Sequence, residues 1–270
     1  MATRDMVTWE TAIARVASGA EDEEIIVRDH RLSELIGATS FSGMMFLLLQ
    51  GRLPEDSETR LLDALLVASV EHGIAPPSMI ARCFASYGTS IQAAVGGGLL
   101  AFGDRMGGLG EQLARLMSER VTALAEEEGC ALGALDGGRL AETAECLVAD
   151  LHRQGERVPG YGIPLHCADP RAPAVLAVAR REGLYGSYCR MATAIEESLA
   201  SRRGGRAVPL NLDGVGAAVV LDLGFDWRST RLFLLTARSV SLGAHFLEES
   251  EQDTRWRHVT ADRITYLGDR

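Results

Sequence analysis

The sequence contains no lysine, so all 27 of its basic residues are arginines. No apolar run reaches the length of about 18 residues that a membrane-spanning helix needs, and the first ten residues lack the apolar core of a signal peptide. We therefore expect neither a membrane protein nor a secreted one. The formal net charge of −10 argues against nucleic acid as the main partner, because phosphate binding needs a concentrated basic surface.

Cysteine is present but forms no pattern that predicts a metal site or a disulfide framework. The five cysteines are scattered along the chain, and no two have the spacing of metal ligands: Cys83, Cys130, Cys146, Cys167 and Cys189. Reduced thiols in a cytoplasmic protein are the simplest interpretation. Phosphate-loop, dinucleotide-binding and nucleophile-elbow motifs are also missing, so no resident cofactor and no metal are expected.

What the sequence does contain is helical periodicity over most of its 270 residues. Apolar positions repeat at helical spacing in residues 8–18, 32–36, 41–49, 55–72, 89–102, 109–128, 139–154, 174–182, 185–202, 215–223 and 231–248. A short strand is expected only at residues 25–27, and residues 260–268 form an extended tail. The predicted fold class is all-α.

Three consecutive glycines, Gly96 to Gly98, lie inside the apolar helix predicted at residues 89–102. Together they cost the helix about 2 to 3 kcal/mol relative to alanine. We interpret them as a site where a second helix comes very close, either elsewhere in this chain or in a second copy of it. A flexible linker is the alternative, but linkers are polar.

The residues that could carry chemistry are spread along the chain. Residues 158–173 hold four prolines and two glycines, which predicts an ordered loop with Tyr161, His166 and Arg171 as its reactive side chains. His72 ends the helix predicted at residues 55–72, where a histidine often serves the helix dipole. Asp213 precedes a helix, so N-terminal capping is the simplest local interpretation.

Taken together, six short motifs resemble the citrate synthase family. The resemblance covers residues 25–268 and is closest to the short members, the citryl-CoA lyases and the C-terminal domain of ATP citrate lyase. Each motif is weak alone, but all six occur in the family's order: LSELIGATSFSGMMFLLLQGRLP, EHG, GDRMGG, PGYGIPLHCADPRA, PLNLDGVGA and TARSVSLGAHFLEE.

This resemblance implies a two-domain helical fold that forms a homodimer or a larger homo-oligomer. Residues 1–107 and 208–270 would form the large, dimer-forming domain, and residues 108–207 the smaller lid domain. The two would close over a coenzyme A thioester, bound as a substrate, and a di- or tricarboxylate.

The resemblance also implies roles for individual residues. His72 and Arg238 match the family's substrate-binding histidine and arginine, the latter through charged hydrogen bonds to a carboxylate. Asp213 matches the aspartate that exchanges a proton with the acetyl group of acetyl-CoA. The arginine that the second subunit contributes aligns with Ala261, and Arg263 lies two residues further on.

Two positions depart from the family pattern. Met106 stands where a histidine stabilises the thioester enolate, and Ile163 stands where a histidine polarises the ketone of the keto acid. Neither side chain donates a hydrogen bond. Arg105, beside Met106, and His166, three residues after Ile163, are the candidate substitutes.

The sequence thus favours a citrate synthase or citryl-CoA lyase-like protein that acts on the carbon–carbon bond between acetyl-CoA and an oxaloacetate-like keto acid. The altered site predicts an acyltransferase or lyase that is a poor standard citrate synthase. The alternative is a catalytically degenerate homologue that binds coenzyme A or a dicarboxylate as a sensor or partner subunit. A purely structural helical protein is a third hypothesis, which the retention of His72, Asp213 and Arg238 disfavours.

Overall fold

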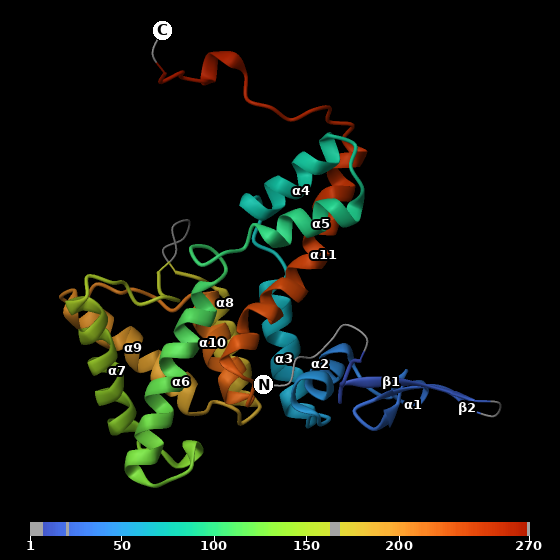
Figure 1. Ribbon diagram of the computed structural model, residues 1–270. Helices are drawn as coiled ribbons and strands as arrows, with labels where there is room; N and C mark the ends of the chain where they lie inside the picture. Colours follow the sequence, from blue (N-terminus) through green and yellow to red (C-terminus); the bar gives the residue numbers. More distant parts are fainter. Residues whose placement is uncertain (1–7, 20–21, 163–167, 269–270) are drawn as a thin grey trace.

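The computed structural model describes residues 8–19, 22–162 and 168–268. Most of these residues are helical, which confirms the all-α prediction (Figure 1). The α-helices are α1 Leu32–Leu35, α2 Phe41–Gln50, α3 Asp56–Ser69, α4 Pro76–Ser86, α5 Ile91–Leu100, α6 Leu109–Glu128, α7 Gly137–Arg153, α8 Arg171–Arg181, α9 Ser187–Arg202, α10 Leu212–Asp222 and α11 Thr230–Glu251. Within the described ranges, every helix is too short or too polar to span a lipid bilayer.

The helix predicted at residues 8–18 is wrong. Ala14–Gly19 forms strand β1, which pairs antiparallel with β2 Asp22–Val27, and β2 pairs with the short β3 His30–Arg31. Ile13 and Val16 have helical spacing, but both are exposed and find no core to cover. Both are also β-branched, and such residues suit a strand once a partner is available, which the predicted strand at residues 25–27 supplies.

The other predicted helices are found to within a few residues, with one consequence for the site. Helix α3 ends at Ser69 rather than continuing to residue 72. His72 therefore lies in the loop between α3 and α4, just before Gly73, whose φ of +71° is the left-handed conformation that glycine favours. Helix α4 was not predicted, although Pro76 and Pro77 occupy its first two positions, where proline is well tolerated.

Helix α10 is the centre of the main hydrophobic core. Its residues Val215, Ala217, Ala218 and Val219 are completely buried, and it contacts α3, α6, α8 and α9. This all-round burial explains why its sequence is apolar on every face. The start of α10 is therefore held rigidly, and Asp213 lies there.

A second, smaller core holds the glycine triplet of α5 against α4 and α11 (Figure 1). A Cβ atom on Gly97 would clash with the ring of Phe84 in α4, and one on Gly98 would lie 2.9 Å from Leu242 in α11. The predicted close packing is thus confirmed within one chain. Gly96 has no neighbour within 4 Å of its Cβ position in the described chain, and its role toward a second copy stays a prediction.

After α11 the chain runs away from the body as an extended tail with one short 3-10 helix, Ala261–Arg263 (Figure 1). The tail is fixed near its start, because Arg257 N donates to Ser86 Oγ at 3.1 Å and Tyr87 Oη donates to Arg257 O at 2.9 Å. Beyond this point Ile264, Tyr266 and Leu267 are exposed.

Candidate active site

A cavity of about 1260 Å³ opens where the N-termini of α6, α8 and α10 approach the middle of α11. Ligand pockets commonly measure about 300–1,000 Å³, so this cavity has room for a large ligand. Its lining includes His72, Arg105, Met106, Asp213 and Arg238. Five of the eight residues singled out from the sequence are therefore brought together here.

Asp213 lies in the first turn of α10 but does not cap it. The cap is Asn211, whose side-chain oxygen accepts a hydrogen bond from Gly214 N at 3.1 Å. The capping interpretation of Asp213 is therefore wrong, and its carboxylate lines the cavity. Burial raises the pKa of Asp213, while the positive charges of Arg171 and Arg238 oppose that rise without cancelling it.

The loop at residues 158–162 is fastened to the segment that precedes α10. Gly162 N donates to Pro209 O at 2.7 Å, Asn211 N donates to Gly160 O at 3.1 Å, and Asn211 Nδ2 donates to Gly162 O at 2.7 Å. Gly160 has a φ of +83°, and a Cβ atom there would lie 2.7 Å from Gly214 Cα. Only glycine permits this approach, which closes one wall of the cavity next to Asp213.

Tyr161, one of the reactive candidates in this loop, has a structural contact. Its hydroxyl donates to Ala192 O in α9 at 2.8 Å, and burial raises its pKa well above the usual value. The hydroxyl is therefore kept neutral and engaged with the backbone of α9.

Arg171 begins α8 and is held in place by Asp169. The Asp169 carboxylate, which is completely buried, accepts two hydrogen bonds from the Arg171 guanidinium at 2.8 and 2.7 Å and one from Leu212 N at 3.0 Å. Burial raises the pKa of Asp169, but these hydrogen bonds outweigh it and leave the pKa lowered. Arg171 also lines the cavity, and its buried Nη1 finds no hydrogen-bond partner among the described residues. One edge of this fixed cation is thus available to an anion.

Arg238 approaches the cavity from the middle of α11. Burial lowers its pKa, while the carboxylate of Glu71 acts in the opposite direction. Its Nη1 atom is 4.0 Å from Glu71 Oε1, and its buried Nε has no hydrogen-bond partner in the described part of the chain. Two arginines therefore flank a buried carboxyl group, an arrangement suited to an anionic ligand that exchanges a proton.

The family follows from the sequence match. Residues 55–259 match the citrate synthase C-terminal domain family, which is more than half of the chain. The chain belongs to the citrate synthase family. The structure of citryl-CoA lyase from Hydrogenobacter thermophilus is similar to it, with a TM-score of 0.83 and 32% identity over 97% of this chain and 95% of that one.

Two further members of the citrate synthase family differ from this chain in length. The citrate/2-methylcitrate synthase of Bacillus subtilis is 25% identical over 86% of this chain and 57% of its own length. ATP citrate lyase from Methanothrix soehngenii, solved with citrate and coenzyme A, has a TM-score of 0.78 and 19% identity over 99% of this chain and 43% of that one, which shows a shared fold. The chain spans about half the length of the curated relatives it matches.

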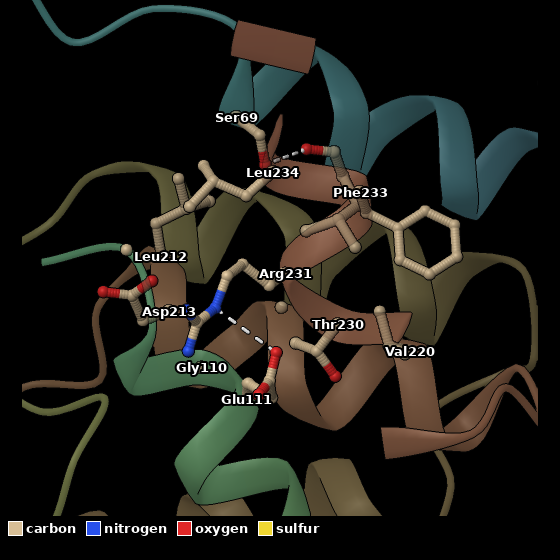
Figure 2. Close-up of a pocket in the computed structure, with 13 residues that line it drawn as sticks. Ser69, Gly110, Glu111, Leu212, Asp213, Val220, Thr230, Arg231, Phe233 and Leu234 are labelled. Atoms are coloured by element: carbon tan, nitrogen blue, oxygen red, sulfur yellow. Dashed lines mark hydrogen bonds and ion pairs between the residues drawn. The ribbon is translucent and has the colours of Figure 1, made fainter. Parts of the chain in front are cut away.

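The turn that departs from the family pattern is well ordered. Gly103 and Met106 exchange backbone hydrogen bonds of 2.9 and 3.0 Å. Arg231 of α11 holds the turn, pairing with Asp104 at 2.7 Å and with Glu111 at 3.3 Å. Figure 2 shows the latter pair beside Asp213, in a small pocket of about 30 Å³ between α6, α10 and α11. Met106 and Arg105 are therefore presented to the cavity by a supported turn.

Three predicted site residues are not placed in the cavity. Ile163 and His166 lie outside the described residues, so their roles stay predictions. Arg263 lies in the exposed 3-10 helix of the tail, which runs away from the body (Figure 1). Only a second copy of the chain could receive it, as the resemblance implies, and this too stays a prediction.

Proposed function

We propose that the protein cleaves or forms the carbon–carbon bond between a coenzyme A thioester and a keto acid such as oxaloacetate. The single observation that carries this proposal is the raised pKa of a carboxyl group, Asp213, between Arg171 and Arg238 in one cavity. Because the full-length similarity is to a citryl-CoA lyase, we favour the cleavage direction.

In cleavage, Asp213 acts as the acid. As the hydroxyl of the citryl group loses its proton and becomes a ketone, the carbon–carbon bond breaks and its electron pair forms the thioester enolate. Asp213 then gives its proton to the enolate carbon, and the thioester leaves as acetyl-CoA. In synthesis the same carboxylate removes that proton. A raised pKa favours both directions, because it brings the carboxyl group toward the range where an acid and its base are both present.

Arginines provide the anion contacts. Arg171 and Arg238, with His72, would hold the carboxylates of the acid by charge-assisted hydrogen bonds. At another part of the cavity wall, the exposed side chains of Arg157, Arg202 and Arg203 form a basic group suited to the phosphates of coenzyme A. These contacts need no lysine.

The electrophilic group is the weak part of the site. Met106 cannot donate a hydrogen bond to the enolate oxygen, so we assign this role to its neighbour Arg105, which also lines the cavity. The second candidate function, a ligand-binding homologue without turnover, is favoured by this same apolar residue.

We further propose that the active unit is a homodimer, with residues 108–207 as the smaller domain. Met79, Leu100, Val240 and Leu247 are exposed on α4, α5 and α11, on the part of the molecule that also carries the open side of Gly96. A second copy would cover them and receive the tail with Arg263. Sedimentation as a monomer at micromolar concentration would contradict this.

The test of the function uses both directions. We expect free coenzyme A from acetyl-CoA plus oxaloacetate, or acetyl-CoA from citryl-CoA, at a rate below that of an ordinary citrate synthase. Asp213→Asn should abolish both reactions. If coenzyme A and citrate bind without any turnover, the binding function replaces the enzyme, and if neither binds at millimolar concentration, both proposals fail.

A further inference from the structure

Glu71, the residue before His72, contacts both of the candidate carboxylate-binding residues. Its Oε1 atom accepts hydrogen bonds from the backbone N–H groups of His72 at 2.7 Å and Gly73 at 2.6 Å. The same oxygen is 4.0 Å from Arg238 Nη1. One carboxylate thus joins the loop after α3 to the middle of α11.

His245, on α11, holds the other oxygen of Glu71. Its Nε2 is 3.3 Å from Glu71 Oε2, and its Nδ1 is 3.3 Å from Arg82 Nη1. A guanidinium only donates hydrogen bonds, so Nδ1 must be the accepting nitrogen. The hydrogen of the neutral ring is therefore on Nε2, which donates to Glu71. The contacts of His245 fix both its tautomer and its orientation.

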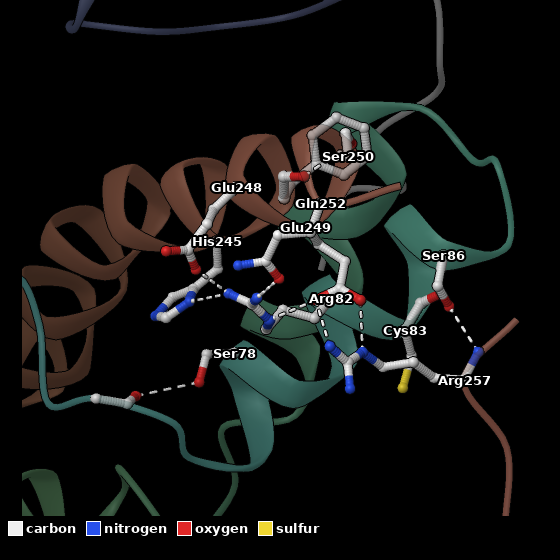
Figure 3. Close-up of polar contacts among 12 residues, drawn as sticks. Ser78, Arg82, Cys83, Ser86, His245, Glu248, Glu249, Ser250, Gln252 and Arg257 are labelled. Atoms are coloured by element: carbon white, nitrogen blue, oxygen red, sulfur yellow. Dashed lines mark hydrogen bonds and ion pairs between the residues drawn. The ribbon is translucent and has the colours of Figure 1, made fainter. Parts of the chain in front are cut away.

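Arg82, the base of this chain of contacts, is itself firmly held (Figure 3). Its side chain is 10% exposed and pairs with Glu249 at 2.6 Å and with Glu248. It also donates to Gln252 Oε1 at 2.7 Å. The Glu249 side chain is completely buried and also pairs with Arg257 at the start of the tail. A multiply bonded guanidinium gives His245 a rigid support.

Glu71 is suited to orient Arg238 without occupying it. Burial raises the pKa of Glu71, but the hydrogen bonds from His72 and Gly73 contribute to a net lowering, so the carboxylate is charged at neutral pH. At 4.0 Å it attracts the guanidinium but is too far for a direct hydrogen bond. The N–H groups of Arg238 therefore stay available to a ligand in the cavity.

We propose that Glu71 is a positioning residue that sets the spacing of His72 and Arg238 for one carboxylate-bearing ligand, with His245 and Arg82 as its support. This rests on the proposed function, in which these two residues hold the acid. Glu71 does not contact the ligand in this scheme. It acts by keeping two ligand contacts, from different elements, in one fixed geometry.

The test compares Glu71→Ala and Glu71→Gln with the parent protein by calorimetry, using citrate and coenzyme A as separate probes. Misplacing binding groups by about 1 Å costs up to about 100-fold, so we expect Glu71→Ala to weaken citrate binding about 10- to 100-fold. Coenzyme A binding should change less than about twofold, because its proposed contacts lie elsewhere. Glu71→Gln keeps an oxygen for the His72 and Gly73 N–H groups and should recover part of the loss.

Glu248→Gln is the matched control, because Glu248 pairs with Arg82 but not with Glu71, and it should leave both affinities unchanged. The inference is overturned if Glu71→Ala leaves citrate affinity intact, if Glu71→Gln tightens citrate binding, or if both ligands weaken together with a loss of Tm.

Unliganded crystal structures of the parent and Glu71→Ala separate this inference from the proposed function. Arg238 and the loop of His72 should move in the variant, whether or not the parent binds citrate. If they move but the parent binds no citrate, the proposed function fails and the positioning role stands. If they stay in place, the inference fails.

Discussion

The two sides of the cavity are built to different standards. On one side Arg171, Asp213 and Arg238 are fixed by buried ion pairs and by helix α10, and each has a charge that suits a reacting carboxylic acid. On the other side the turn at residues 103–108 is equally well supported by Arg231, yet it presents a methionine. The difference shows that a loop can keep its structure while its chemistry changes, because backbone hydrogen bonds and glycines hold the turn, and the side chain at position 106 does not.

The largest expected effect comes from the acid side. Asp213→Asn keeps the shape of the side chain but can no longer transfer a proton, so turnover should fall by at least about 10²- to 10⁴-fold. Citrate affinity, measured by calorimetry, should stay within a few-fold because Arg171 and Arg238 remain. Wild-type turnover in the variant would refute the assignment of Asp213.

Met106→His should sharpen the comparison from the other side. One oxyanion donor contributes about 10²- to 10³-fold, so we expect kcat to rise about 10- to 100-fold when a donor is introduced into the supported turn. Met106→Leu, which supplies no donor, is the control and should not differ from the parent. If both variants are slower than the parent, the methionine has a role of its own in the reaction.

Arg171→Lys should have a smaller effect. Lysine keeps the positive charge beside Asp169 but loses the planar fork, so KM for the acid should rise about tenfold, which corresponds to about 1.4 kcal/mol. The control is Arg181→Lys on the same helix, where the arginine is largely exposed and pairs with Glu182. An equal change in both variants would mean that the helix, rather than the fork, is affected.

The smallest effect is on stability and depends on pH. Because burial raises the pKa of Asp213 above its usual 3.8 in the folded protein, the folded state binds this proton more tightly than the unfolded state does. Stability therefore falls as pH rises from 3.8 through the raised pKa. Asp213→Asn should raise the Tm at pH 7, and its advantage should shrink as pH is lowered toward 4. A Tm advantage that is independent of pH would contradict a buried, charged Asp213.

Local patterns predicted the regular part of the fold and failed where long-range contacts decide. The long helices α6 and α7 follow from apolar periodicity alone. Residues 14–19 became a strand because β2 pairs with them, which helical spacing cannot reveal. Helix α4 was missed because its two prolines were not recognised as a helix start, and α3 was extended too far toward His72.

The site was predicted in part for the same reason. Asp213 looked like a cap until Asn211 was found in that position, and only the fold shows that loop residue Arg171 lies beside Asp213. The spacing of Asp169 and Arg171 before a helix was a usable signal, since an acid two residues before an arginine can hold it. The link from Glu71 through His245 to Arg82 spans more than 160 residues, and no local pattern contains it.

The central claim is that Asp213 exchanges a proton with the acyl group of a coenzyme A thioester, and hydrogen–deuterium exchange tests it even if overall turnover is slow. Acetyl-CoA is incubated with the protein and oxaloacetate in D₂O, and loss of the methyl proton signal is followed by NMR. We predict exchange above the buffer rate for the parent and none for Asp213→Asn. No exchange with the parent, or equal exchange with both, would contradict the claim.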